Sequence, residues 1–120
     1  MNTLIDVLIA IVALFHVYAF VLESLLWQTP RAMRIFGTTT ETAATTRTLA
    51  VNQGVYNLIL ATGLFWSLIA ANPIAFQLRI FFLICVVVAA VTAGLVVSRR
   101  IMLIQGTPAL IALILVLVFR

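Results

Sequence analysis

The sequence predicts an all-α, polytopic membrane protein with four transmembrane helices in a bundle, and three observations lead to that fold class. First, 65% of the 120 residues are hydrophobic and only 8% are charged, whereas a soluble domain has about 45–50% apolar and about 25% charged residues. Second, the apolar residues form continuous runs of about the 20 residues that a helix needs to cross a membrane. Third, these runs lack the alternation of polar and apolar side chains that marks the strands of a membrane barrel.

The same composition excludes other classes of protein. A chain this apolar is not disordered, and its single cysteine, Cys85, cannot form an internal disulfide scaffold. Nucleic-acid binding needs a dense basic face, but five of the seven basic residues lie in two short segments. We therefore expect the lipid bilayer, and no nucleic acid, as the environment of this chain.

Four apolar runs are long enough to cross the membrane, and together they use most of the chain. They cover about residues 4–27, 49–71, 76–97 and 101–119. So little remains outside them that we expect a single membrane domain over residues 1–120. The first run is interpreted as an uncleaved span, since it is too long for a signal peptide and contains Asp6.

The segment after the first span has the residues of a short helix. Thr29 suits the N-cap position, Pro30 the first helical position and Gly37 the C-terminal end. We expect a helix over about residues 30–36 that lies in the headgroup layer, with its arginines toward lipid phosphates. The threonine-rich residues 38–48 are expected to form a solvated loop.

The arginines also indicate an orientation. Five of them lie in the loops at about residues 28–47 and 98–100, and two lie on the opposite side. Because positive charge favours the cytoplasmic side, we expect a multi-pass protein of the inner (cell) membrane with both termini outside. Asp6 is expected near the outer interface in contact with water.

Polar side chains within the spans are the candidate site, because polar groups are costly in hydrocarbon. His16 and Glu23 are seven residues apart, which places them on one face of a helix. Counted from the loops at about 1.5 Å per residue, most of the polar residues lie at a similar depth. The candidate ligand-binding or proton-carrying residues are Glu23, His16, Asn52, Gln53, Tyr56, Asn57 and Gln105.

A helix break is expected in the fourth span. Pro108 removes the hydrogen bond to the carbonyl of Ile104, and Gly106 adds backbone freedom. The break and the polar residues coincide in depth, which favours a polar pocket at that level. No metal or other cofactor is expected, since a metal site needs about three or four ligands.

Three blocks of residues resemble a known family. They are His16…Glu23…Trp27, the block Asn52-Gln53-Gly54-Val55-Tyr56-Asn57, and Gln105-Gly106-Thr107-Pro108-Ala109. The chain resembles, over nearly its whole length, the small four-helix bacterial membrane proteins classed as a domain of unknown function, DUF1304. The resemblance implies a four-span membrane protein and no particular activity.

Three functions remain open on the residues alone. The polar layer could bind, and transport with proton coupling, a small polar or amphiphilic molecule, with Glu23 as the ionisable centre. His16 and Glu23 could instead be the acid/base pair of an isomerase or hydratase acting on a lipid-like substrate. In an accessory or structural subunit, the same side chains would only join helices. Ala90 and Gly94 fit either close helix packing within the chain or the seam of a homo-oligomer.

Overall fold

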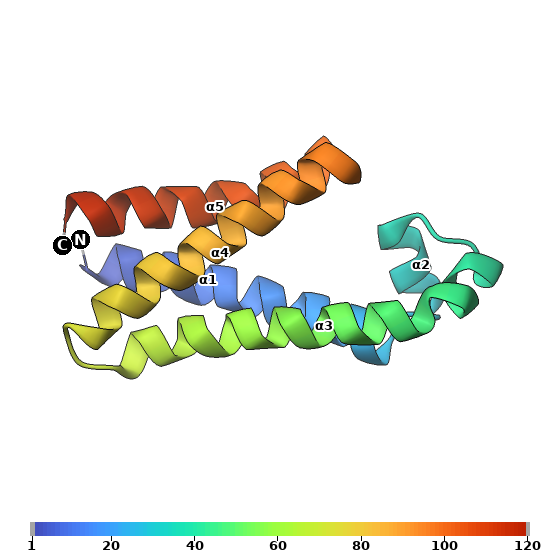
Figure 1. Ribbon diagram of the computed structural model, residues 1–120, viewed down its shortest axis with the longest axis horizontal. Helices are drawn as coiled ribbons and strands as arrows, with labels where there is room; N and C mark the ends of the chain where they lie inside the picture. The colour runs from blue at the N-terminus through green and yellow to red at the C-terminus, as the bar shows by residue number, and fades with distance from the viewer. Residues whose placement is uncertain (1, 120) are drawn as a thin grey trace. The chain divides into compact units, whose positions relative to one another are not determined.

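The computed structural model describes residues 2–119, which are helical apart from short connections. Within this range there are no strands, as the predicted all-α class requires. The elements in order are α1 (Asn2–Phe20), the π-helical turn η1 (Val21–Leu25), α2 (Pro30–Phe36), α3 (Thr40–Ile69), α4 (Ile74–Val96) and α5 (Arg99–Val118) (Figure 1).

Three helical stretches are long and apolar enough to cross a membrane. They are Asn2–Leu25, Ile74–Val96 and Arg99–Val118. Many of their large apolar side chains are exposed, including Leu14, Phe81 and Leu95. Water does not favour so much exposed apolar surface, so these side chains suit contact with lipid. The protein is therefore helical and membrane-like in character.

Helix α3 contains the second predicted span but is longer and more polar than expected. It begins at Thr40 and has 30 residues, so the expectation of a solvated loop over residues 38–48 is wrong. The Thr39 hydroxyl accepts a hydrogen bond from the Thr42 amide at 3.1 Å, and Thr46 donates to the carbonyl of Thr42 at 2.7 Å. The first bond satisfies a free amide at the start of the helix, as an N-cap side chain does, and the second is the local bond that threonine makes to a carbonyl inside a helix.

The chain divides into two compact units, and each is described by itself. The first contains α1 up to Phe15 and the chain from Leu60 onward. Its four helical segments surround one apolar core that includes Ile9, Leu64, Leu83 and Ala112. At one end of this unit, the start of α1 and the end of α5 lie beside the connection between α3 and α4 (Figure 1).

Small residues let α4 and α5 approach each other closely. A Cβ atom on Gly106 would lie 2.9 Å from the Cβ of Ala90, and one on Gly94 would lie 2.9 Å from the Cβ of Met102. Ala90 and Gly94 therefore serve packing within the chain, the first of the two roles left open. Helix α5 stays helical through Pro108, so the predicted break is reduced to the one hydrogen bond that proline cannot donate.

The second unit contains residues His16–Ile59: the end of α1, η1, α2 and the first part of α3. Helix α2 has the predicted bounds and the predicted caps. Thr29 accepts from the Ala32 amide at 3.4 Å, Pro30 takes the first position, and Gly37 ends the helix with φ of 68°. Glycine adopts this left-handed conformation without steric cost.

Candidate functional site

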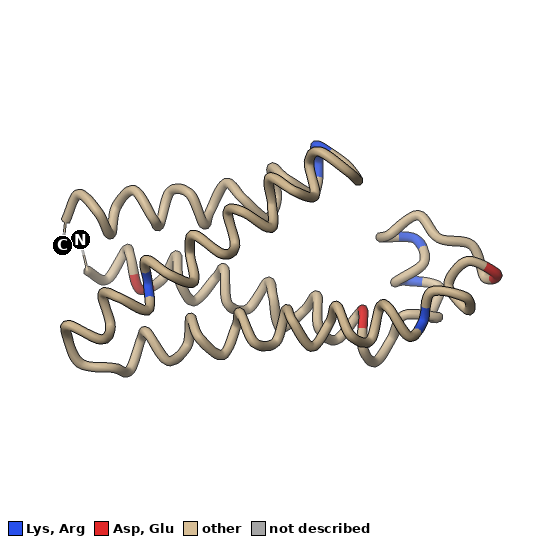
Figure 2. Tube along the Cα trace, in the orientation of Figure 1, with Lys and Arg blue, Asp and Glu red and all other residues tan. Residues whose placement is uncertain are grey.

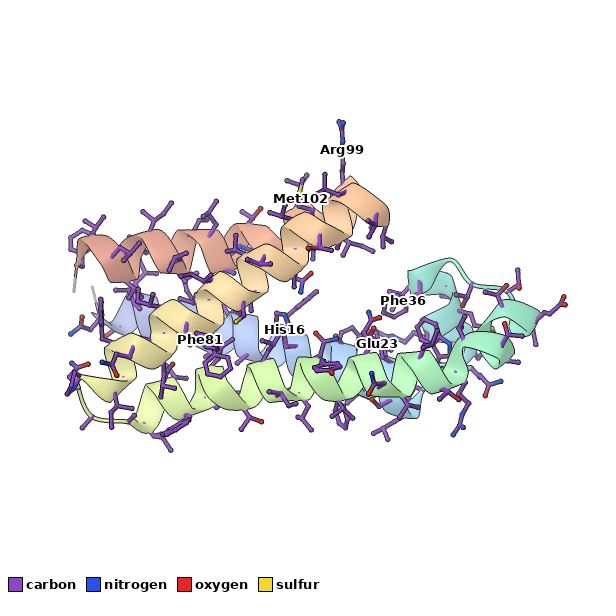
Figure 3. All side chains as sticks on the ribbon, in the orientation of Figure 1. His16, Glu23, Phe36, Phe81, Arg99 and Met102 are labelled. Carbon is purple, nitrogen blue, oxygen red and sulfur yellow. The ribbon has the colours of Figure 1, made fainter. Side chains whose placement is uncertain are left out.

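The first helical stretch changes its geometry at Glu23. From Val21 to Leu25 the helix has π geometry, and the Leu26 amide donates to the Val21 carbonyl at 3.0 Å. A π turn holds more residues than an α turn and is frequent at functional sites. Glu23 lies in this turn and meets Asn57 of α3 (Figure 3).

Glu23 is buried and held by amide side chains of α3. Only 2% of the residue is exposed. The Asn57 side-chain nitrogen donates to Glu23 Oε1 at 2.5 Å and also to the Gln53 carbonyl at 3.3 Å. The Gln53 side chain lies near the same carboxylate. A buried carboxylate needs such donors, so the polar block of α3 is matched to Glu23.

A close helix approach lies next to this carboxylate. The Ser24 hydroxyl donates to the Val51 carbonyl at 2.9 Å. A Cβ atom on Gly54 would collide with the Ser24 hydroxyl and lie 3.0 Å from the Ser24 backbone nitrogen. Glycine at position 54 is thus required for η1 to lie against α3, which brings Asn57 within reach of Glu23.

Aromatic contacts tie α2 into the same unit. The Trp27 and Phe36 rings are 5.0 Å apart between centroids, and the Trp27 indole donates to the Thr46 hydroxyl at 3.2 Å. Arg31 donates through Nε to the Tyr18 hydroxyl at 3.0 Å and lies 5.8 Å from the centre of that ring. These contacts fix the segment that follows Glu23.

The other predicted site residues differ in their surroundings. His16 is fully buried in α1, whereas Asn52, Gln53 and Tyr56 are exposed on α3. Gln105 is half-buried in α5, and it belongs with Gly106 and Pro108 to the other unit. The structure therefore joins Glu23 to Asn57 and Gln53.

Sequence reasoning missed the π turn and the roles of Ser24, Gly54 and Thr46. A glycine inside a polar helical block was the available sign of a close helix approach. No residue in Val21–Leu25 is a proline or glycine, so nothing local marks the change of helix geometry.

The chemistry available at Glu23 is that of a hydrogen-bond acceptor. An ionised carboxylate offers only acceptor sites, about four in total, and the amides of α3 supply the described donors. Within residues 2–119, no group of three or more His, Cys, Asp or Glu side chains could hold a metal ion. The site is therefore suited to binding a donor group or exchanging a proton.

One comparison with known proteins identifies a family. No curated protein and no solved structure matches the sequence. A family model described as "Protein of unknown function (DUF1304)" matches residues 10–117. That range contains η1, α2, α3 and α4, and with them Glu23, Gly54 and Asn57. The chain therefore belongs to the DUF1304 family.

Proposed function

We propose that this protein binds a small amphiphilic molecule at Glu23. The observation that carries the proposal is the buried carboxylate at a π turn, held by Asn57 from the facing helix. A buried carboxylate is energetically costly in a membrane, so its presence there favours a functional role. Exposed Asn52, Gln53 and Tyr56 supply further polar groups on the same helix.

The carboxylate defines the chemistry of the ligand. Glu23 can accept hydrogen bonds but, when ionised, cannot donate them. The ligand would therefore carry an ammonium or another N–H donor, which would take an oxygen of Glu23 in competition with Asn57. An apolar portion would let the ligand reach this site from the bilayer. His16, buried on the same helical stretch, is proposed as a proton relay.

The proposal includes a topology of four spans in one membrane domain. Helix α3 is about 45 Å long at 1.5 Å per residue, more than the roughly 30 Å of the hydrocarbon core. Its C-terminal part would form the second span, and its threonine-rich start would extend into the cytoplasm. Helix α2 would lie in the headgroup layer with Arg31 and Arg34 toward phosphates. Both termini would then lie outside.

The test compares wild type with Glu23→Gln, which keeps the shape of the side chain and removes the ionisable group. Detergent-purified protein is incubated with dodecylamine, or with dodecanol as the neutral match, and examined by native mass spectrometry. We expect wild type to retain the amine in preference to the alcohol. In Glu23→Gln the retained amine should fall roughly tenfold, the loss of one charge-assisted hydrogen bond.

Glu41→Gln is the matched control, since Glu41 is an exposed acid at the start of α3. It removes the same charge and should bind the amine as wild type does. Equal retention of the amine by all three proteins would refute ligand binding at Glu23. If Glu23→Gln lost thermal stability while binding stayed unchanged, the contacts would serve only to join helices.

Proton-coupled transport is the second part of the proposal. In proteoliposomes with an entrapped pH dye, an outward proton gradient should drive dodecylamine uptake by wild type faster than in protein-free liposomes, where only the neutral amine crosses the bilayer. Glu23→Gln should reduce the dye signal to that of protein-free liposomes, because glutamine cannot carry a proton. Binding without any protein-dependent dye signal would limit the function to binding.

A further inference from the structure

The first unit contains a polar pocket that is separate from Glu23. It has a volume of about 640 Å³ and lies where the start of α1, the start of α4 and the end of α5 come together. Its polar lining includes Asp6, Asn72 and Arg79, and its apolar lining includes Phe76, Val116 and Phe119. The volume is that of a small-molecule site.

An ion pair lies in this pocket and is incompletely satisfied. Arg79 Nη2 donates to Asp6 Oδ1 at 2.7 Å and to the Ser67 carbonyl at 3.5 Å. The Arg79 Nε atom is buried and has no hydrogen-bond partner among the described residues. A buried donor without an acceptor is costly, and this one belongs to the side of the guanidinium that binds an anion with two parallel hydrogen bonds.

The exposure of the two side chains is unequal. The Arg79 side chain is 18% exposed, whereas that of Asp6 is 48% exposed. Asp6 can accept several hydrogen bonds besides the one from Arg79. The pocket therefore offers a buried anion site and, beside it, an accessible cation site.

The charges select a ligand that carries both signs. Asp6 would repel a purely anionic ligand, and Arg79 would repel a purely cationic one. A zwitterion can satisfy both residues without adding net charge. Three candidate spans begin or end at this pocket, and lipid headgroups lie at the ends of membrane spans.

We propose that this pocket binds the headgroup of a zwitterionic phospholipid with a primary amine, such as phosphatidylethanolamine. A small shift of the Arg79 side chain brings Nε to the pocket, where the phosphate accepts from Nε and replaces the Ser67 carbonyl as the second acceptor of Nη2. Asp6 keeps its hydrogen bond from Nη2 and accepts a further one from the ammonium. The glycerol and the first methylene groups lie against Phe76, Val116 and Phe119. Figure 2 shows how few charged positions the chain has, which makes a pair of opposite charges at this end distinctive.

The first test uses wild type alone and varies only the headgroup. Dioleoyl phosphatidylethanolamine, its N,N-dimethyl and N,N,N-trimethyl forms, and dioleoyl phosphatidylglycerol are titrated into purified protein and followed by native mass spectrometry. Affinity should fall with methylation as N–H donors are lost, to roughly tenfold weaker for the trimethyl form. Phosphatidylglycerol, which lacks a cation, should bind no better than the trimethyl lipid. Equal affinity for all four lipids would overturn the proposal.

The second test changes the pocket. Asp6→Asn should weaken binding of the primary amine more than binding of the trimethyl form, which keeps its charge but has no N–H donor, and so remove the preference between them. Arg79→Lys should weaken binding of every lipid because lysine lacks the planar fork. Glu41→Gln, which removes an equal charge far along the sequence, should keep the wild-type preference. A preference that survives in Asp6→Asn would exclude Asp6 as the ammonium site.

Water-soluble glycerophosphoethanolamine separates a lipid from a free zwitterion. It carries the same headgroup without acyl chains, so it should compete only weakly with the lipid. Competition as strong as that of the intact lipid would overturn the assignment to a phospholipid. This pocket uses none of the residues proposed for the amine at Glu23, so the two proposals can fail independently.

Discussion

Different interactions stabilise each of the two units of this protein. The first unit has an apolar core, close contacts between small residues such as Gly106 and Ala90, and one ion pair. In the second unit, side-chain hydrogen bonds join η1 and the following turn to α3, through Ser24, Glu23 and Trp27. Packing in the first unit tolerates apolar substitutions of equal volume, whereas each hydrogen bond of the second needs a particular partner.

The largest loss of stability is expected for a substitution in the second unit at a place where the packing cannot relax. Gly54→Ala places a methyl group against the Ser24 backbone nitrogen, which cannot move without moving η1. We expect a loss of about 1–3 kcal/mol, the cost of overpacking. The matched control is Gly63→Ala in the first unit, where the new methyl meets the Phe82 ring, a side chain that can rotate. Thermal unfolding in detergent should show the larger decrease for Gly54→Ala, and the reverse order would contradict the role given to Gly54.

The next largest loss of stability is expected when Glu23 loses its hydrogen-bond donor Asn57 and remains buried. Asn57→Leu removes the hydrogen bond that the Asn57 side chain donates to Glu23, a residue that is only 2% exposed. A buried polar group without its partner costs about 1–3 kcal/mol. Asn52→Leu is the control, since Asn52 is an exposed amide on the same helix. Chemical denaturation should separate the two variants, and equal stability would mean that Asn57 does not support the carboxylate.

A smaller effect is expected between α4 and α5 of the first unit. Gly106→Ala brings a new methyl within 2.9 Å of the Ala90 methyl, which is attached directly to the backbone. Gly94→Ala likewise comes within 2.9 Å of the Met102 Cβ, and it also meets the Met102 sulfur. We expect a cost of about 1 kcal/mol for each change, in line with the lower range of overpacking costs. Melting temperatures of the two variants check this, and an unchanged melting temperature in either would contradict the close approach of α4 and α5 at that glycine.

The smallest effect concerns a single hydrogen bond of the second unit. Thr46→Val removes the acceptor of the Trp27 indole and should cost about 0.6 kcal/mol, the average for such bonds in membrane proteins. Thr45→Val is the control, because the Thr45 hydroxyl bonds only to helix carbonyls. In a Trp66→Phe background, the Trp27 fluorescence spectrum should shift for Thr46→Val alone. A shift of equal size in both variants would exclude a specific Trp27–Thr46 contact.

The sequence predicted those parts of the fold that depend on neighbouring residues. The bounds of α2 follow from Thr29, Pro30 and Gly37, which act within one or two helical turns. Helix α4 begins at Ile74, within two residues of the start of the third apolar run at about residue 76. The threonine-rich segment is helical where a loop was expected, because threonine hydroxyls also form hydrogen bonds inside a helix, such as that of Thr46 to the Thr42 carbonyl.

Contacts between distant residues were harder to predict, although one was within reach. Asp6 was expected near the outer interface in contact with water, and its half-exposed side chain also pairs with Arg79, which the sequence analysis did not predict. Both residues lie about one and a half turns into helices that start at the same end of the unit. Counting residues from the start of each helix would therefore have placed Asp6 and Arg79 at the same depth and suggested the pair. The hydrogen bond from Asn57 to Glu23 involves a residue of the π turn. A prediction that assumes 3.6 residues per turn does not anticipate such a turn.

The π turn also gives this site an unusual dependence on chain length. The Leu26-to-Val21 hydrogen bond encloses one residue more than an α-helical bond would. Deleting a single residue from Val21–Leu25 would therefore allow a regular α-helix, and His16 and Tyr18 would keep their positions relative to the chain after Leu26, because the π turn holds the one extra residue. The change would fall on Glu23 and Ser24, whose side chains would move to regular helical positions and lose the placement that meets Asn57 and Val51. In genetic terms, a one-codon deletion in this turn would remove the site and spare the rest of the helix.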